Sequence, residues 1–82
     1  MVRVLLFAHP RELLSAEFVD LPLAPGTYLA ALREALASTY PLLEVSLSAC
    51  QFAVDETLVP LEQGASTLAP ELVALIPPVS GG

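Results

Sequence analysis

The chain begins and ends with a short, almost continuously apolar segment. Residues 2–8 read Val-Arg-Val-Leu-Leu-Phe-Ala, and residues 72–76 read Leu-Val-Ala-Leu-Ile. Runs of this length, rich in β-branched and apolar residues, are typical of strands that are buried on most of their surface. Such strands suit the centre of a sheet, where they can pair as parallel neighbours. We therefore expect a sheet in which strands from the two ends of the chain lie side by side.

The first half of the intervening sequence predicts one more strand and one helix. A proline-containing loop at residues 9–12 ends the first strand, and residues 16–21 then pair with it as an antiparallel hairpin. Residues 28–38 are expected to form a helix with Thr27 as its N-cap, and Pro41 prevents its continuation. The helix has a single apolar stripe, which predicts three core residues, Leu29, Leu32 and Leu36.

The second half of the intervening sequence returns to the sheet. Residues 42–49 are ambiguous between a loop and an irregular short element. Residues 51–54 and 57–59 read as short strands joined by a tight connection at Asp55-Glu56, and residues 60–69 read as a loop. The order strand, strand, helix, strand, short strand, strand gives two layers around one core.

This order predicts an α+β fold, namely the β-grasp of ubiquitin-like proteins, in which one main helix crosses a mixed sheet. A chain of 82 residues has room for one small domain only. We expect that domain to span residues 1–76, with residues 77–82 as a flexible Gly-Gly tail.

The composition predicts a surface for a protein partner. Fifty-five per cent of the residues are apolar and only 15% are charged, which is more apolar surface than a small core can absorb. The surplus is expected in an exposed patch, although an unusually apolar monomeric domain is an alternative. The net charge of −6 disfavours binding to nucleic acid or to a membrane surface, and it suits a basic partner.

Few side chains in this sequence are candidates for catalysis or metal binding. Cys50 is the only cysteine, which excludes an intramolecular disulfide and a Cys-rich zinc site. His9 has no acid and nucleophile around it in the sequence, so we expect a solvent-facing loop residue and no metal site. No targeting segment and no membrane-spanning run is recognised, which predicts a cytoplasmic location.

The last six residues offer reactive chemistry without a reactive side chain. Pro77 and Pro78 end the preceding strand and hold the chain extended. Gly81 and Gly82 lack a Cβ atom and can thread a narrow channel. The four residues after Pro78 reach at most roughly 13–14 Å. The α-carboxylate of Gly82 is therefore the candidate reactive group, delivered into the active site of another protein.

Several of these segments resemble the small subunit of molybdopterin synthase, and the similarity extends over the whole chain. The opening Val4-Leu5-Leu6-Phe7-Ala8 with Arg11-Glu12 and the middle Phe52-Ala53-Val54-Asp55 carry part of it. The most specific part is the closing decapeptide, Val73 to Gly82. One departure is Ala69-Pro70-Glu71, where the family usually has Gly-Asp-Glu, and the proline there predicts a different turn.

The resemblance implies a sulfur carrier. In that family an activating enzyme related to ubiquitin-activating enzymes uses ATP to adenylate the C-terminal carboxylate, which then becomes a thiocarboxylate. The large synthase subunit receives the tail, and the sulfur passes to cyclic pyranopterin monophosphate to form the dithiolene of molybdopterin. The resemblance further implies a heterotetramer of two small and two large subunits. It also implies that the isolated chain has no stably bound cofactor and that the large subunit supplies the catalytic side chains.

The resemblance also assigns roles to individual residues. Gly82 would carry the sulfur, and Gly81 would give it clearance. The loop residue Arg11 would pair with an acid on the activating enzyme. The partner-binding positions are, besides Arg11, three apolar residues and the lead-in to the double glycine: Phe7, Leu58, Leu75, Pro77, Pro78, Val79 and Ser80.

Two other functions share the fold and the tail. A ubiquitin-like modifier would be conjugated through Gly82 to lysines of target proteins, and a related carrier would serve thiamin synthesis or tRNA thiolation. The Pro-Pro-Val-Ser lead-in favours the molybdopterin route. A purely structural interaction domain with an inert tail is a third alternative.

Overall fold

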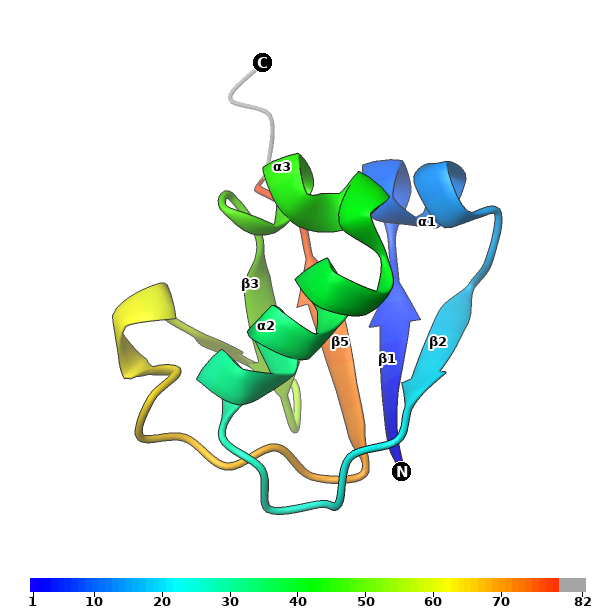
Figure 1. Cartoon of the computed structure of the whole chain (residues 1–82). Helices are drawn as coiled ribbons and strands as arrows, with labels where there is room; N and C mark the ends of the chain where they lie inside the picture. Colours follow the sequence, from blue (N-terminus) through cyan, green and yellow to red (C-terminus); the bar gives the residue numbers. More distant parts are fainter. Residues whose placement is uncertain (79–82) are drawn as a thin grey trace.

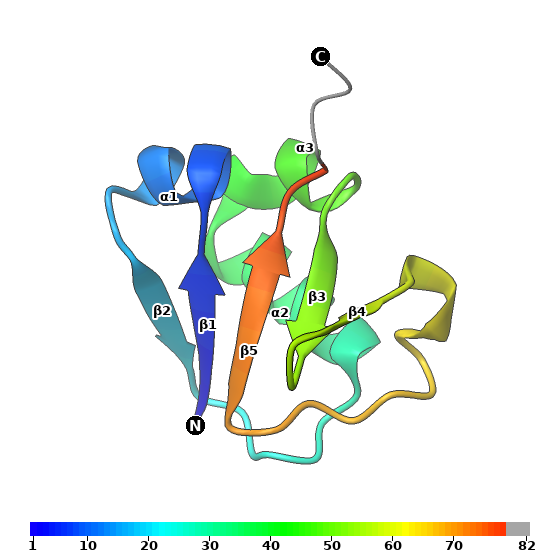
Figure 2. The same ribbon diagram turned by 180° about the vertical axis from the view of Figure 1, so that it is seen from behind.

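The computed structural model describes residues 1–78 and contains one five-stranded mixed sheet with helices on one face (Figures 1 and 2). The strand order across the sheet is β2-β1-β5-β3-β4. The elements are, in chain order, β1 (Val2–Leu6), α1 (Ala8–Leu14), β2 (Phe18–Leu21), α2 (Leu29–Thr39), the 3-10 turn η1 (Pro41–Leu43), α3 (Glu44–Leu47), β3 (Gln51–Val54), β4 (Thr57–Val59), the 3-10 turn η2 (Leu61–Gln63) and β5 (Leu72–Ile76).

The two apolar runs form the middle of the sheet, as the sequence predicts. β1 and β5 pair in parallel, with Val4 opposite Val73 and Leu6 opposite Leu75. β5 pairs on its other side with β3 in the antiparallel sense. Because β5 has a neighbour on both sides, its backbone hydrogen bonds are satisfied and its course is fixed up to Ile76. The strand that leads into the tail is therefore the central strand of the sheet.

The connection between β1 and β2 differs from the prediction. The two strands are antiparallel neighbours as expected, but residues 8–14 form helix α1 instead of a proline-containing loop. Pro10 is the third residue of this helix, where the backbone N–H has no intrahelical partner, so the proline costs no hydrogen bond. Pro10 is also buried, and α1 packs against η1 at the end of the molecule from which the chain leaves β5 (Figure 1).

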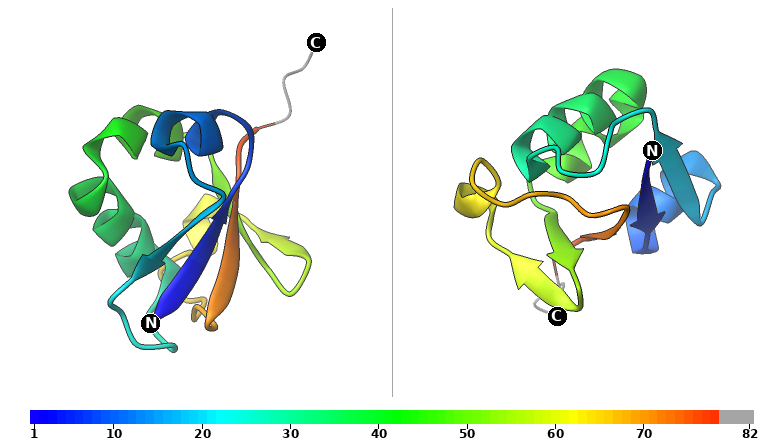
Figure 3. Two further views of the ribbon diagram at one scale, coloured as in Figure 1. Left: turned by 90° about the vertical axis from the view of Figure 1, so that its right-hand side faces the viewer. Right: turned by 90° about the horizontal axis from the view of Figure 1, so that it is seen from below.

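Helix α2 crosses one face of the sheet and closes the core (Figure 3, left). Its predicted stripe is confirmed, because Leu29, Leu32 and Leu36 are all buried. The predicted N-cap is wrong: the cap position is Tyr28, and the Thr27 hydroxyl donates instead to the Ala24 carbonyl at 2.8 Å. The buried residues of the other elements complete one core: Val2, Val4, Leu6, Val19, Leu21, Leu43, Leu47, Cys50, Phe52, Ala69, Val73 and Leu75.

Three short segments complete the helical layer and the sheet edge. Pro41 ends α2 but begins the turn η1, which continues directly into α3, so residues 42–49 form the irregular short element that the sequence left open. β3 and β4 form the predicted hairpin, and its two turn residues, Asp55 and Glu56, both have left-handed backbone angles (φ 50° and 66°). This geometry fits the two-residue turn that matches the twist of a hairpin.

The two layers leave one face of the sheet open. The helices cover the face that carries the core, and no element within residues 1–78 covers the other (Figure 3, left). None of the helices in this part of the chain is long and apolar enough to cross a bilayer. The uncovered sheet surface is defined here as the open face, and no described element prevents a partner from contacting it.

Candidate functional site

The tail leaves the domain at the end of β5. β5 runs parallel to β1, so its last residue, Ile76, lies at the end of the sheet where β1 passes into α1 (Figure 2). Pro77 is half-buried and Pro78 is exposed, which places the start of the tail at the surface, at the same end of the molecule as α1 and α3 (Figure 2). Four predicted site residues, Val79, Ser80, Gly81 and Gly82, lie outside the described residues.

Apolar side chains form a row across the open face. The strand register aligns Leu5 with Phe18 of β2 on one side and with Ala74 of β5 on the other. Ala74 is in turn opposite Ala53, and Ala53 is opposite Leu58 of β4. One residue from each of the five strands therefore contributes to a continuous apolar row. None of these five residues is buried, so the composition-based prediction of an exposed patch is confirmed at this surface.

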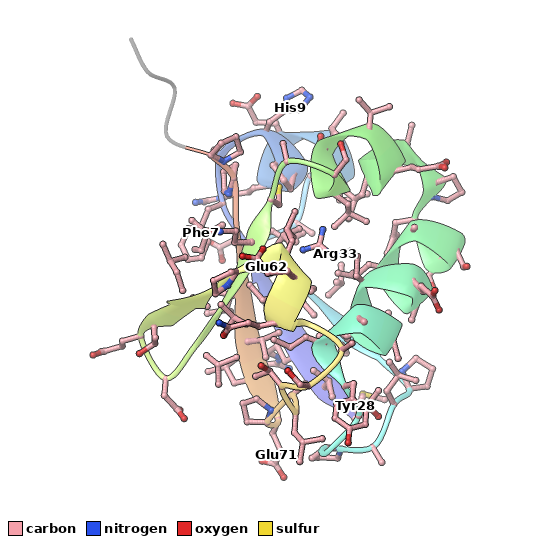
Figure 4. All side chains as sticks on the ribbon, turned by 90° about the vertical axis from the view of Figure 1, so that its left-hand side faces the viewer. Phe7, His9, Tyr28, Arg33, Glu62 and Glu71 are labelled. Carbon is pink, nitrogen blue, oxygen red and sulfur yellow. The ribbon has the colours of Figure 1, made fainter. Side chains whose placement is uncertain are left out.

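The predicted partner-binding residues divide between this face and the core. Leu58 lies in the apolar row and is 53% exposed, while Phe7, which directly follows β1, is 43% exposed. Figure 4 places Phe7 on the side of the sheet opposite α2. Leu75 is 0% exposed and packs in the core under α2. Its assignment as a partner-binding residue is therefore wrong, because a buried side chain presents no surface to another protein.

Two exposed apolar residues of the open face were not predicted from the sequence. Phe18 and Leu72 are 41% and 52% exposed. Phe18 lies under the Arg3 guanidinium, 3.9 Å from its ring centroid, and Arg3 also forms a salt bridge with Asp20 at 2.9 Å. The hydrogen bond from Arg3 lowers the pKa of the Asp20 carboxyl and raises that of Arg3. Phe18 shares a face of β2 with the polar Asp20, two residues further on, and this spacing is the sequence signal for its exposure.

Arg11 and His9 belong to α1, which lies at the end of the molecule where the chain leaves β5 (Figure 2). Arg11 is exposed and donates through one guanidinium nitrogen to the Glu17 carboxylate at 3.1 Å, which leaves its other N–H groups available to an acidic residue of a partner. His9 is exposed, as expected, although it belongs to a helix and not to a loop.

The remaining candidate for side-chain chemistry, Cys50, is part of the core. Its thiol is buried, and burial raises its pKa, so the reactive thiolate form is disfavoured. Arg33 from α2 donates to the carbonyl of Leu47 and to that of Cys50, and so ties α2 to the end of α3. Within residues 1–78, no group of three or more His, Cys, Asp or Glu side chains is placed to hold a metal ion.

The chain is similar to known proteins over nearly its whole length. It matches the ThiS family over residues 4–82. The molybdopterin synthase sulfur carrier subunit of Dictyostelium discoideum is 33% identical over 82 residues, which cover 98% of this chain and 94% of that protein. The protein of the same name from Mycosarcoma maydis is 41% identical over 87 residues, covering 99% of this chain and 92% of that protein.

A solved structure supports the same assignment. The crystal structure of SAMP1 from Haloferax volcanii superposes with a TM-score of 0.75 and 25% sequence identity, covering 99% of this chain and 98% of that one. This similarity confirms the predicted β-grasp class. The chain therefore belongs to the ThiS family of ubiquitin-like proteins, and its relatives include sulfur carrier subunits of molybdopterin synthase.

Proposed function

We propose that this protein is the sulfur carrier subunit of a molybdopterin synthase. The observation that carries the proposal is the similarity, over almost the full chain, to proteins of that name from three organisms. The fold is consistent with it: a rigid central strand ends at Ile76, beside an exposed apolar face, and the sequence then continues through Pro77-Pro78 to the double glycine. The domain would dock, and the tail would carry the sulfur.

The proposed chemistry takes place at the α-carboxylate of Gly82. A carboxylate is a poor electrophile until one of its oxygens becomes part of a good leaving group. An activating enzyme would supply this by transferring AMP from ATP to the carboxylate, with release of pyrophosphate. A sulfur donor then displaces AMP and leaves a thiocarboxylate. ATP is thus a substrate of the activating enzyme, and we propose no stably bound cofactor for this chain.

The second step would take place in the large subunit of the synthase. The tethered thiocarboxylate is delivered at a high local concentration, so its reaction with the pterin does not depend on free diffusion. The acids and bases for that step would come from the large subunit. We propose that the open face forms most of the contact with this subunit, in a cytoplasmic heterotetramer.

Intact-mass spectrometry tests the carrier function directly. The purified chain is incubated with ATP, its activating enzyme and a sulfur source, and its mass is measured before and after. Replacement of one carboxylate oxygen by sulfur increases the mass by about 16 Da. A variant truncated after Ser80 should remain folded by circular dichroism, gain no mass and fail to support molybdopterin formation.

Measurements of adducts in cells and of the sulfur acceptor distinguish the alternatives. Isopeptide-linked adducts in cells, without a thiocarboxylate on the free chain, would support a ubiquitin-like modifier and contradict the carrier proposal. A loaded chain that thiolates a thiamin precursor or tRNA, but not the pterin, would assign it to another carrier pathway. Full activity of the truncated variant would mean that the tail is inert.

A further inference from the structure

The open face ends in a groove at the side of the molecule opposite the tail. The groove has a volume of about 550 Å³. Leu5, Ala53 and Ala74 of the apolar row, called here the groove floor, line it together with the apolar residues Pro70 and Leu72. The groove is therefore a continuation of the open face, and it begins where β5 begins.

Three carboxylates line this groove. They belong to Asp55, Glu56 and Glu71, all of which are exposed. Figure 4 shows Glu71 at the end of the molecule opposite His9, and thus opposite the start of the tail. The backbone fixes all three positions: Asp55 and Glu56 form the two-residue turn of the β3–β4 hairpin, and the Glu71 carbonyl accepts a 2.7 Å hydrogen bond from the Arg3 N–H.

No cation of the described chain neutralises these three acids. The arginines have other partners: Arg3 is paired with Asp20, Arg11 with Glu17, and Arg33 donates to two backbone carbonyls. The sequence contains no lysine. Within residues 1–78, no basic group forms a salt bridge with Asp55, Glu56 or Glu71. The groove thus combines an apolar floor with fixed, unneutralised negative charge, and carboxylates that become buried in an interface require a cationic partner.

We propose that this acidic groove receives a segment of the large synthase subunit that places an apolar side chain on the groove floor and Lys or Arg beside it. The inference rests on the proposed function, because it specifies the partner's surface at the end of the open face farthest from the tail. A second copy of this chain does not fit, since each copy carries a net charge of −6 and like charges would meet in the groove. The groove would fix the orientation of the domain while the tail enters the partner's active site.

Neutralisation of the groove acids tests this proposal. The first variant combines Asp55→Asn, Glu56→Gln and Glu71→Gln; asparagine tolerates the left-handed angle of residue 55. The matched control removes the same three charges from exposed positions on α1, α2 and α3, with Glu12→Gln, Glu34→Gln and Glu44→Gln. Binding to the purified large subunit is measured by calorimetry and stopped-flow fluorescence over a range of NaCl concentrations.

The groove variant should bind about ten-fold more weakly at low salt, from three lost ion pairs of modest strength, and its affinity should depend less on salt. The control variant should retain wild-type affinity and salt dependence. Equal affinities and salt slopes for the two variants would overturn the groove proposal while leaving the carrier function intact, provided that both still gain about 16 Da in the loading reaction. Absence of wild-type binding together with absence of loading would instead overturn the proposed function itself.

Discussion

A single backbone angle identifies a residue that limits stability. Ala8, the first residue of α1, has φ 52°, in the left-handed region that costs an L-residue about 1–2 kcal/mol. Glycine adopts this region without that cost, so Ala8→Gly should increase the free energy of unfolding by about 0.5–1 kcal/mol, measured by urea denaturation. The matched control is Ala31→Gly, at an exposed position inside α2, which should lower stability by about 1 kcal/mol. Destabilisation by both substitutions would show that Ala8 is not strained in solution.

The Arg3–Asp20 pair predicts a pH-dependent contribution to stability. The hydrogen bond from Arg3 places the folded-state pKa of Asp20 below the value of about 3.9 expected for the unfolded chain. As the pH falls, Asp20 is therefore protonated in the unfolded chain before it is protonated in the folded one. The pair contributes its full stability above about pH 3.9, and this contribution is lost as the pH falls through the lowered folded-state pKa of Asp20. Urea titrations should show Asp20→Asn to be less stable than wild type at neutral pH, with the difference disappearing in strong acid. In an Arg3→Met background Asp20→Asn should have no such effect; a persistent difference there would contradict this interpretation.

At the scale of elements, α2 is the helix on which the core depends. Leu36 is fully buried between α2 and the sheet, so Leu36→Ala should lower the free energy of unfolding by about 2–5 kcal/mol. That is a large part of the roughly 4–12 kcal/mol expected for a domain of this length. Leu42→Ala, at a 65% exposed position in η1, should change stability by no more than about 0.5 kcal/mol. Both changes in the free energy of unfolding are measured by chemical denaturation. Similar losses for the two variants would contradict the burial of Leu36 and the exposure of Leu42 in solution.

The same scale shows what the sequence could predict. Local apolar runs and breaking residues were sufficient for all five strands and for α2, because each depends on its own periodicity. The sequence does not predict helix α1, because Pro10 resembles a helix breaker, whereas a proline in the first turn leaves no intrahelical hydrogen bond unmade. The position of Leu75 could not be predicted either. Every residue from Leu72 to Ile76 is apolar, so only the pairing with β1 determines that Val73 and Leu75 face the core while Ala74 faces the partner surface.

The candidate site was also only partly predictable from the sequence. The apolar surplus predicted a patch correctly, yet its five residues come from five strands and are brought together only by the register. The acids of the groove are likewise distant in the sequence, since Asp55 and Glu56 are in the hairpin turn and Glu71 precedes β5. No sequence pattern joins them, because the contact is made by sheet pairing and not by spacing.

At the scale of the whole molecule, the two sides of the domain should respond differently to the same change. The helical side encloses the core, whereas the open face carries the apolar row on β-strands that the core already holds in place. Leu58→Asp should therefore leave the domain folded, because the side chain is 53% exposed. It should weaken binding to the large subunit by about ten-fold or more, because a charge would be buried in the apolar contact.

Val45→Asp, at an 85% exposed position on α3, introduces the same charge on the helical side and should leave the affinity unchanged. Calorimetric titration of each variant with the large subunit, after circular dichroism has verified the fold, checks both expectations. If Val45→Asp weakened binding and Leu58→Asp did not, the partner would dock on the helices, and the proposal that the open face contacts the large subunit would be wrong.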